Sequence, residues 1–388
     1  MVFGLGYLAA GPIGGLLSLA IVSSRLVAQD RPVAASSAVK DKTSAASVLT
    51  QAQWKRLDRA VDRALVFLSR SQEADGSFPT IRSAQPGVTS LCVMAFLARG
   101  HQPGKGPYGP RIERAIDYAL DLQDRLNGAI MADQSSGTGG FECGNYNHGI
   151  SGVMLGEVYG MTGAKRHARI RSAIVKGLEY IRKQQLREKP AEERGGWRYV
   201  GRSGSNNSDL SVTAWQLMFY RSARNAEFNV PEDWVKDAMA YVHRSFDENE
   251  RAFVYALFGG NRYCTRGMAG AGIVSLALGG EHQSASAKMA GDWILQHSFE
   301  PYNNFRGPED RYHYGAFYCS QAMYQLGGEY WRRFFPSLLA VLAEAQNADG
   351  SWAKESVGED GEFGNAYTTS LAVLALSPPY QILPIYQR

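Results

Sequence analysis

Six polar residues recur at one position of a repeating pattern, and these side chains could do chemistry together. Each stands five residues before a small residue near the start of an apolar segment; these small residues are Ser90, Gly152, Ala214, Gly270, Cys319 and Ser370. If the apolar segments are parallel helices, the six polar residues lie at one end of them and face one opening. We name them the polar column: Gln85, Asn147, Asp209, Thr265, Tyr314 and Asn365.

Further reactive side chains flank the polar column. His148 and Arg266 directly follow two of its members, His313 precedes another, and Cys143 and Cys264 stand in the segments before it. The acid–base groups suited to proton transfer belong to Asp209, His148, His313 and Tyr314. The candidate ligand-binding residues are Gln85, Asn147, Thr265, Arg266 and Asn365.

Zinc is a weaker possibility for the same region. Thiolate and imidazole are zinc ligands, so Cys143, His148, Cys264 and His313 are candidates for a metal site. Their spacing matches no zinc motif, and we expect no other cofactor. In the alternative, the cysteines are small buried residues and the histidines bond to their neighbours.

A structural role competes with chemistry in the polar column itself. Asp, Asn and Thr are favoured helix N-caps, because their side chains accept a bond from a free N–H of the first turn. We therefore expect Asn147, Asp209, Thr265 and Asn365 to cap helices. The helix dipole would also keep the Asp209 carboxylate ionised, which makes it a poor proton donor unless burial raises its pKa.

Pairs of helices are the elements that must position these residues. An amphipathic helix followed by Gln and then Gly-x-aromatic occurs in "VDRALVFLSRSQEADGSFPT" and "LLAVLAEAQNADGSWAK". With weaker copies, the pattern repeats about every 50 residues. The second helix of each pair, such as "GMAGAGIVSLAL", is apolar nearly all round and is expected to be buried.

The repeats predict an all-α fold over residues 53–388. Buried second helices would form an inner ring and amphipathic first helices an outer ring, which gives an α/α toroid of about six helical hairpins. An open solenoid of the same pairs is the alternative, because the number of repeats does not decide whether the ring closes.

The repeat resembles the QW-type repeat of the squalene/hopene cyclase and protein prenyltransferase β-subunit superfamily over residues 53–382. It is closest to exported bacterial proteins with prenyltransferase and squalene oxidase repeats. "YNHGISGVMLGEVYGMTG", "GGWRYVGRSGSNNSDLSVTAWQLM", "FYCSQAMYQLGGEYWRRFFPSL" and "NADGSW" carry the resemblance. It implies a toroid with an apolar central cavity that binds an isoprenoid or other lipid-like ligand.

The motifs of the known reactions are missing from this chain. If Thr213 matches the Thr that follows the cyclases' Asp-x-Asp-Asp motif, Asp209 is the first Asp, but Ser211 replaces the protonating one. No DDxxD motif occurs, and Tyr314 replaces the first zinc ligand of the prenyltransferases. The resemblance therefore leaves open whether a bound ligand is transformed, as an isomerase or transferase would do.

Two other classes of function remain open. The toroid could be a non-catalytic interaction scaffold of the cell envelope. It could also be a polysaccharide lyase or hydrolase, a reaction that uses a His or Tyr base and groups that neutralise a carboxylate. The side chains available for that chemistry are His148, His313, Tyr314, Arg266 and Asn365.

The composition indicates which partners to expect, and the N-terminal residues indicate where in the cell the protein acts. A net charge of +4 without a basic run makes nucleic acid an unexpected partner. Residues 1–28 are apolar and read as a signal peptide or a membrane anchor, and residues 29–52 as a disordered linker. We expect an exported protein that is periplasmic, secreted or held at the membrane; its oligomeric state is left open.

Overall fold

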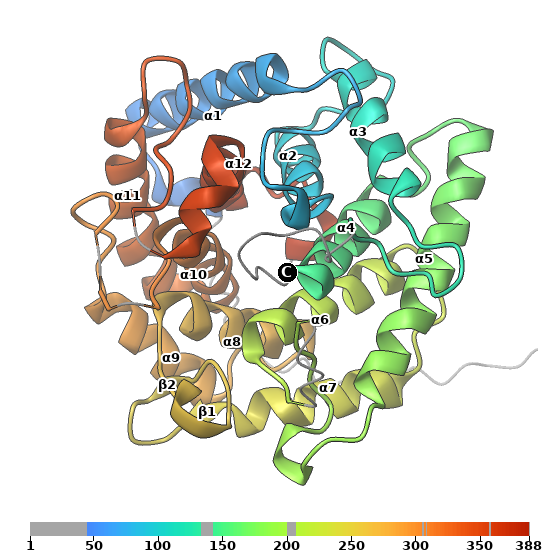
Figure 1. The fold of residues 1–388 in the computed structure, drawn as a ribbon. Helices are drawn as coiled ribbons and strands as arrows, with labels where there is room; N and C mark the ends of the chain where they lie inside the picture. The colour runs from blue at the N-terminus through green and yellow to red at the C-terminus, as the bar shows by residue number, and fades with distance from the viewer. Residues whose placement is uncertain are drawn as a thin grey trace, which may run out of the picture. The chain divides into compact units, whose positions relative to one another are not determined.

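Helices make up most of the described chain and alternate between two rings (Figure 1). The computed structural model describes residues 45–132, 143–199, 207–304, 306–307, 309–356 and 358–387, which belong to the unit Lys42–Arg388. The predicted signal peptide or anchor and the linker up to residue 44 lie outside these ranges. Within them, no helix combines the length and the apolar character needed to cross a bilayer.

The inner ring consists of the apolar helices. Each inner helix contacts the next one, and the last contacts the first, so the ring is closed. Small residues allow this close approach: a Cβ on Gly152 would lie 2.5 Å from the Phe219 ring of the next inner helix. The inner helices are α2 (Gly87–Ala98), α4 (Gly144–Val158), α6 (Leu210–Asn225), α8 (Arg266–Leu278), α10 (Tyr312–Leu326) and α12 (Gly364–Leu376).

The outer ring consists of the amphipathic helices. The first of them starts inside the predicted linker: Thr50 caps it and residues 45–48 form a 3₁₀ turn before it, because the Thr50–Gln53 capping box starts a helix there. The outer helices are α1 (Gln51–Ser71), α3 (Gly109–Asp121), α5 (Ala164–Gln185), α7 (Glu232–Arg244), α9 (Ala285–Gln296) and α11 (Gly328–Ala345).

The repeated Gln fastens neighbouring outer helices to each other. The Gln72 amide nitrogen donates to the carbonyl of Gly76 in its own turn, at 3.0 Å, and to the carbonyl of Arg111 on α3, at 2.9 Å. Gln123 and Gln185 make the same two kinds of bond. Gln346 does so across the ends of the ring, because it bonds to Ala60 on α1 at 2.8 Å.

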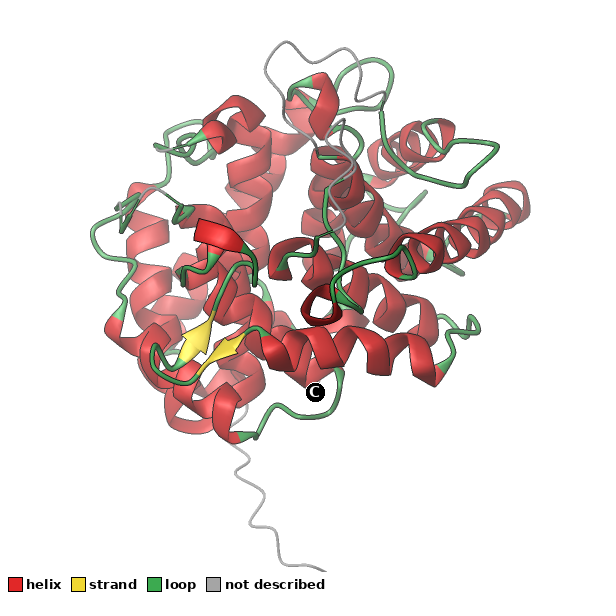
Figure 2. Cartoon of the chain, turned by 60° about the horizontal axis from the view of Figure 1, so that its bottom comes forward, coloured by secondary structure: helices red, strands yellow, loops and turns green. Residues whose placement is uncertain are grey.

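The all-α prediction and the closed toroid are therefore confirmed. In the described ranges, the strands are the two short antiparallel ones β1 (Phe246–Asp247) and β2 (Ala252–Phe253), seen in Figure 2. A 3₁₀ turn, η5 (Glu359–Phe363), leads into α12, and another, η7 (Pro384–Tyr386), ends the chain. The turn η7 packs against α4 and α6, where Ile385 and Tyr386 are buried.

Candidate functional site

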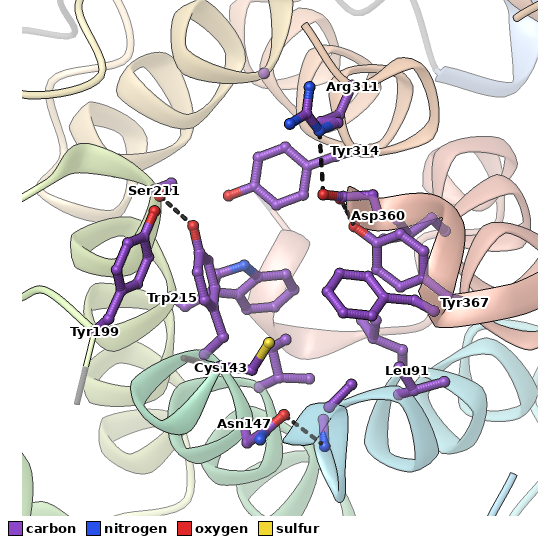
Figure 3. A pocket seen from close by; sticks show the side chains of 18 of the residues that line it. Leu91, Cys143, Asn147, Tyr199, Ser211, Trp215, Arg311, Tyr314, Asp360 and Tyr367 are labelled. Atoms are coloured by element: carbon purple, nitrogen blue, oxygen red, sulfur yellow. Dashed lines mark hydrogen bonds and ion pairs between the residues drawn. The ribbon is translucent and has the colours of Figure 1, made fainter. Parts of the chain in front are cut away.

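A cavity of about 330 Å³ lies where the N-terminal ends of the inner helices meet (Figure 3). Small-molecule sites commonly occupy roughly 300–1,000 Å³. All six inner helices contribute to its wall. Aromatic side chains dominate the wall: Tyr146, Tyr199, Trp215, Tyr255, Tyr263, Tyr314, Phe363 and Tyr367.

Packing and aliphatic neighbours make much of this wall rigid and apolar. The Trp215 ring stacks on Phe317 with a centroid distance of 5.5 Å and an interplanar angle of 8°. Leu91 and Ile150 add aliphatic surface from α2 and α4. These parts of the wall favour contact with an apolar portion of a ligand.

A carboxyl group interrupts the apolar wall at the start of α12. One oxygen of Asp360 lies 3.1 Å from the Arg311 guanidinium, and the other accepts from the Tyr367 hydroxyl at 3.0 Å. Burial raises the pKa of Asp360; the Arg311 charge opposes this rise, and the nearby Glu355 adds to it. A carboxyl group with a raised pKa in a cavity can exchange protons with a ligand.

Tyr314 presents an unsatisfied polar group in the same region. Its hydroxyl is buried and makes no hydrogen bond of ordinary geometry among the described residues, and burial together with the neighbouring Tyr318 hydroxyl raises its pKa. The ring lines the cavity, and Figure 3 shows the hydroxyl directed into it. Buried polar groups are nearly always paired, so an unpaired one in a cavity marks a place where a ligand or water can bond.

The facing part of the wall holds a chain of hydrogen bonds. The Tyr146 hydroxyl bonds to Ser211 Oγ, which donates to Asp209 Oδ1 at 2.5 Å. The Arg198 guanidinium lies 3.2 Å from Asp209 Oδ2 and stacks on the Tyr199 ring at 4.5 Å. The cavity therefore reaches Asp209 through Ser211 and Tyr146.

Asp209 itself is a helix cap behind the cavity wall. Its side chain is fully buried and accepts from the Val212 N–H at 2.8 Å, which confirms the expected cap of α6. Burial raises its pKa, while Arg198, Ser211 and the Val212 N–H lower it. It does not line the cavity, so direct proton transfer from Asp209 to a ligand would need movement or the Ser211 relay.

Three members of the polar column line the cavity. Thr265 caps α8 by accepting from the Met268 N–H at 3.2 Å, as expected. Asn147 lies inside the first turn of α4 rather than at its cap; instead its Oδ1 accepts from the Gly87 N–H, the first amide of the neighbouring α2, at 3.3 Å. Tyr314 is the third.

The remaining two members of the column do not line the cavity. The Gln85 amide donates to the Phe78 carbonyl at 2.8 Å and accepts from Thr89 Oγ1, so it fastens a loop. Asn365 was expected to cap α12, but the cap position is Phe363, because the η5 turn runs directly into the helix.

Arg266, His148 and His313, which flank the polar column in the sequence, bond to other groups of the protein and do not line the cavity. His148 Nδ1 accepts from the Ile130 N–H at 3.0 Å, and burial lowers its pKa to about 3. His313 lies 3.0 Å from Glu355 and 3.0 Å from the Tyr302 hydroxyl. The buried Arg266 pairs with Asp310. None of the three is placed to act on a molecule in the cavity.

The four weak zinc candidates do not form a site. Across the described ranges, no three His, Cys, Asp or Glu side chains come close enough to hold a metal ion. Cys143 lines the cavity, whereas Cys264 does not, and burial raises the pKa of the Cys264 thiol to about 12. None of the chain's cysteines is in a disulfide.

The charged group of the cavity was not among the residues predicted from the sequence. Asp360 and Arg311 belong to the segments before α12 and α10, and 49 residues separate them in the chain. A signal was present in the acidic stretch "GEDGEF" just before the last apolar segment. Nothing in the spacing pairs it with Arg311.

Solved structures with the same fold include enzymes of different reactions. A variant of the type II terpene cyclase MstE from Scytonema, in complex with geranylgeranyl dihydroxybenzoate, matches with a TM-score of 0.57 and 14% identity over 87% of this chain and 100% of that one. An unsaturated glucuronyl hydrolase specific for heparin matches at 0.60 and 12% over 84% and 98%. A D-mannose isomerase matches at 0.60 and 10% over 85% and 97%.

Sequence comparison adds no relative to these structures. No protein-family model matches the chain, and no curated protein matches it. At such low identities the likeness shows the fold alone. The described part of the chain forms an α/α toroid of six helical hairpins, with the architecture found in that terpene cyclase and in the two other enzymes.

Proposed function

We propose that this toroid binds an isoprenoid or another lipid-like small molecule in the aromatic cavity. The observation that carries the proposal is the cavity itself: about 330 Å³ of space inside the inner ring, walled mainly by aromatic and aliphatic side chains. Apolar surface of this kind gains free energy when a ligand of matching shape displaces water. The geranylgeranyl compound bound to MstE supports the proposal by analogy of fold.

The glycan-active alternative retains one of its five candidate residues in the cavity, because Tyr314 lines it. Asn365 lies outside the lining, and His148, His313 and Arg266 bond to other parts of the protein. An experiment can distinguish the non-catalytic scaffold from a ligand-binding protein. Native mass spectrometry of protein purified from its own membrane extract should reveal a co-purifying lipid, and repeated absence of one would favour the scaffold.

Cys143 provides a second readout of occupancy. Its side chain lines the cavity, whereas Cys264 lies outside the lining and serves as an internal control. A bound isoprenoid such as farnesol should slow alkylation of Cys143 and leave that of Cys264 unchanged, as measured by peptide mass spectrometry. Equal rates with and without farnesol would count against the proposal.

A cavity-filling variant sharpens the test. Ile150→Phe adds volume to the cavity wall, so it should weaken the protection of Cys143 by farnesol about tenfold. Val175→Phe places the same ring on a partly exposed face of the outer helix α5 and should change nothing. If both variants bind alike, the ligand does not occupy this cavity.

Export is part of the proposal and rests on the sequence of residues 1–28. An apolar start of this kind would carry the toroid to the cell envelope, either cleaved or as an anchor. Fractionation of cells that produce the full chain, followed by N-terminal sequencing of the protein, tests this. A cytoplasmic protein with an intact start would refute it.

A further inference from the structure

The outer helix α5 and its surroundings carry most of the exposed large apolar side chains. Among the residues that the structure describes, five such side chains are exposed, and four of them lie on α5 or beside it. Val175 is on the helix, Leu186 directly follows it, Met161 belongs to the turn before it, and Leu126 belongs to the turn after α3. Single exposed apolar residues need no explanation, but four along one helix indicate a contact surface.

Leu126 is held beside α5 by a fixed turn. The Gln123 amide donates to the Ala173 carbonyl of α5 at 3.0 Å, and Asp124 Oδ1 accepts from the Leu126 N–H at 2.7 Å. The Leu126 side chain is nevertheless 97% exposed. Figure 1 shows α5 at the outer edge of the ring, with the chain that follows α3 beside it. A leucine that a structured turn presents in this way gains hydrophobic free energy only when a partner covers it.

Cations accompany these apolar side chains. The helix α5 contains seven Lys and Arg residues and one acid, Glu179. Three of the cations fasten α5 to its neighbours, because Arg166 and Arg169 pair with acids of α3 and Arg182 pairs with acids of α7. The other four are exposed and form no ion pair within the described ranges; they are Lys165, Arg171, Lys176 and Lys183.

The helical spacing places both kinds of side chain on one face. Val175 and Leu186 are eleven residues apart, which is about three turns, so they lie in line along the helix. By the same count, Lys176 and Lys183 are about two turns apart on one side of this line, and Arg171 lies on the other side. An apolar line bordered by Lys and Arg is typical of helices that lie in a membrane interface.

We propose that the toroid docks on an anionic membrane surface through α5 and the turn that holds Leu126. The four cations without an ion pair contact the anionic head groups, and the exposed leucines enter the boundary between head groups and acyl chains. The charge favours an anionic over a neutral membrane, and the apolar side chains favour a membrane over a nucleic acid. This inference goes beyond the proposed function, because it concerns where the protein meets lipid and not what the cavity holds.

The first test locates the contact on the full chain. Acylation of lysines by an amine-reactive ester is followed by peptide mass spectrometry. It is measured with vesicles of phosphatidylcholine and phosphatidylglycerol in equal parts, called mixed vesicles, and with vesicles of phosphatidylcholine alone. The mixed vesicles should slow acylation of Lys176 and Lys183 and leave Lys55 on α1 and Lys288 on α9, which are also exposed, unchanged. Equal rates at Lys176 and Lys183 with and without mixed vesicles would overturn the inference, even if residues 1–28 bind the vesicles.

A charge variant tests the electrostatic part, with Lys176 as the probe. Arg171→Gln combined with Lys183→Gln should raise the concentration of mixed vesicles that half-protects Lys176 at least about tenfold, because each cation near an anionic surface contributes about fivefold. The matched control, Lys55→Gln combined with Lys288→Gln, removes the same charge from other sides of the ring and should leave that concentration unchanged. Equal effects of the two double variants would mean that net charge, and not this face, drives the binding.

An apolar variant separates a membrane from an acidic macromolecule. Leu126→Ser combined with Leu186→Ser should weaken the protection of Lys176 about tenfold, whereas Ile382→Ser, at the other exposed apolar residue, should not. If soluble polyglutamate protects Lys176 as well as mixed vesicles do, and the leucine variant changes neither, the partner is an acidic macromolecule and the membrane assignment is wrong. Protection of Cys143 by farnesol should be the same in all these variants, so failure here leaves the proposed function standing.

Discussion

Replacing Asp209 tests whether this buried acid serves the fold or the ligand. Its side chain is fully buried and accepts from Val212 N, from Ser211 Oγ and from the Arg198 guanidinium. Asp209→Ala removes all three bonds and leaves Arg198, whose side chain is 16% exposed, without its carboxylate. We expect a large loss of stability and little change in ligand affinity.

The magnitude follows from the parts that are lost. A missing N-cap costs about 1 kcal/mol, and breaking a buried ion pair by removing one partner costs about 3–5 kcal/mol. Because Arg198 is partly exposed and stacks on Tyr199, the lower end of that range applies. The free energy of unfolding of Asp209→Ala should therefore fall by about 3–4 kcal/mol. Asp209→Asn keeps the acceptor for Val212 and should lose about 1–2 kcal/mol.

Thr265→Ala is the matched control for the cap. Thr265 caps α8 in the same way, through Met268 N, but its side chain carries no charge, so its loss should cost about 1 kcal/mol. Urea titrations of the three variants, compared at similar m-values, give the ranking. A free energy of unfolding of Asp209→Ala that lies within about 0.5 kcal/mol of the value for the unchanged protein would refute the structural role of Asp209. Loss of farnesol binding in a protein of unchanged stability would assign Asp209 to the ligand.

Three further predictions concern the frame around the cavity. Burial raises the pKa of Glu157 from 4.5 to about 7. The protonated side chain therefore stabilises the folded state below pH 4.5, and this contribution to the free energy of unfolding is lost as the pH rises through 7. In urea titrations, Glu157→Gln should reduce the fall in the free energy of unfolding between pH 5 and pH 8 by about 2.5 kcal/mol. Gly195→Ala should cost about 3 kcal/mol or more by the same assay, since its φ is +91° and a Cβ would meet the Asp237 carbonyl at 1.9 Å. Gly160→Ala, at φ +83° in open space, should cost about 1–2 kcal/mol, and equal losses would contradict the contact. Gln346→Leu leaves two carbonyls without their donor and should cost about 2 kcal/mol by urea titration; an unchanged value would mean that this bond does not hold the ring.

The fold could be predicted because its signals are local and repeated. The alternation of amphipathic and nearly uniformly apolar segments identifies outer and inner helices one by one. Closure of the ring is a non-local property, so it came from the resemblance rather than from the pattern. The contacts that close it join distant parts of the chain: α12 packs against α2, and the bond from Gln346 to Ala60 joins residues 286 positions apart.

The candidate site was predicted only in part, for a physical reason. Counting back from the small residues finds the start of each inner helix, and three of the residues found in this way, Asn147, Thr265 and Tyr314, line the cavity. The same rule cannot tell which way a side chain points, so it also selects Gln85 and Asn365, which do not line the cavity. Asp360 is missed because its role depends on a distant ion pair that no periodicity encodes.

The bond between the last and first outer helices has a consequence for how this protein can be assembled and altered. In open helical arrays the end repeats present a polar outer face, and units can be added or removed. Here Gln346 of the sixth pair bonds to Ala60 of the first pair, in the same way that Gln72 of the first pair bonds to Arg111 of the second pair. The cavity wall also needs all six inner helices. Deleting one whole pair should therefore abolish the cavity rather than shorten it, and a chain leaving the ribosome cannot complete its ring until α12, which packs against α2, has emerged.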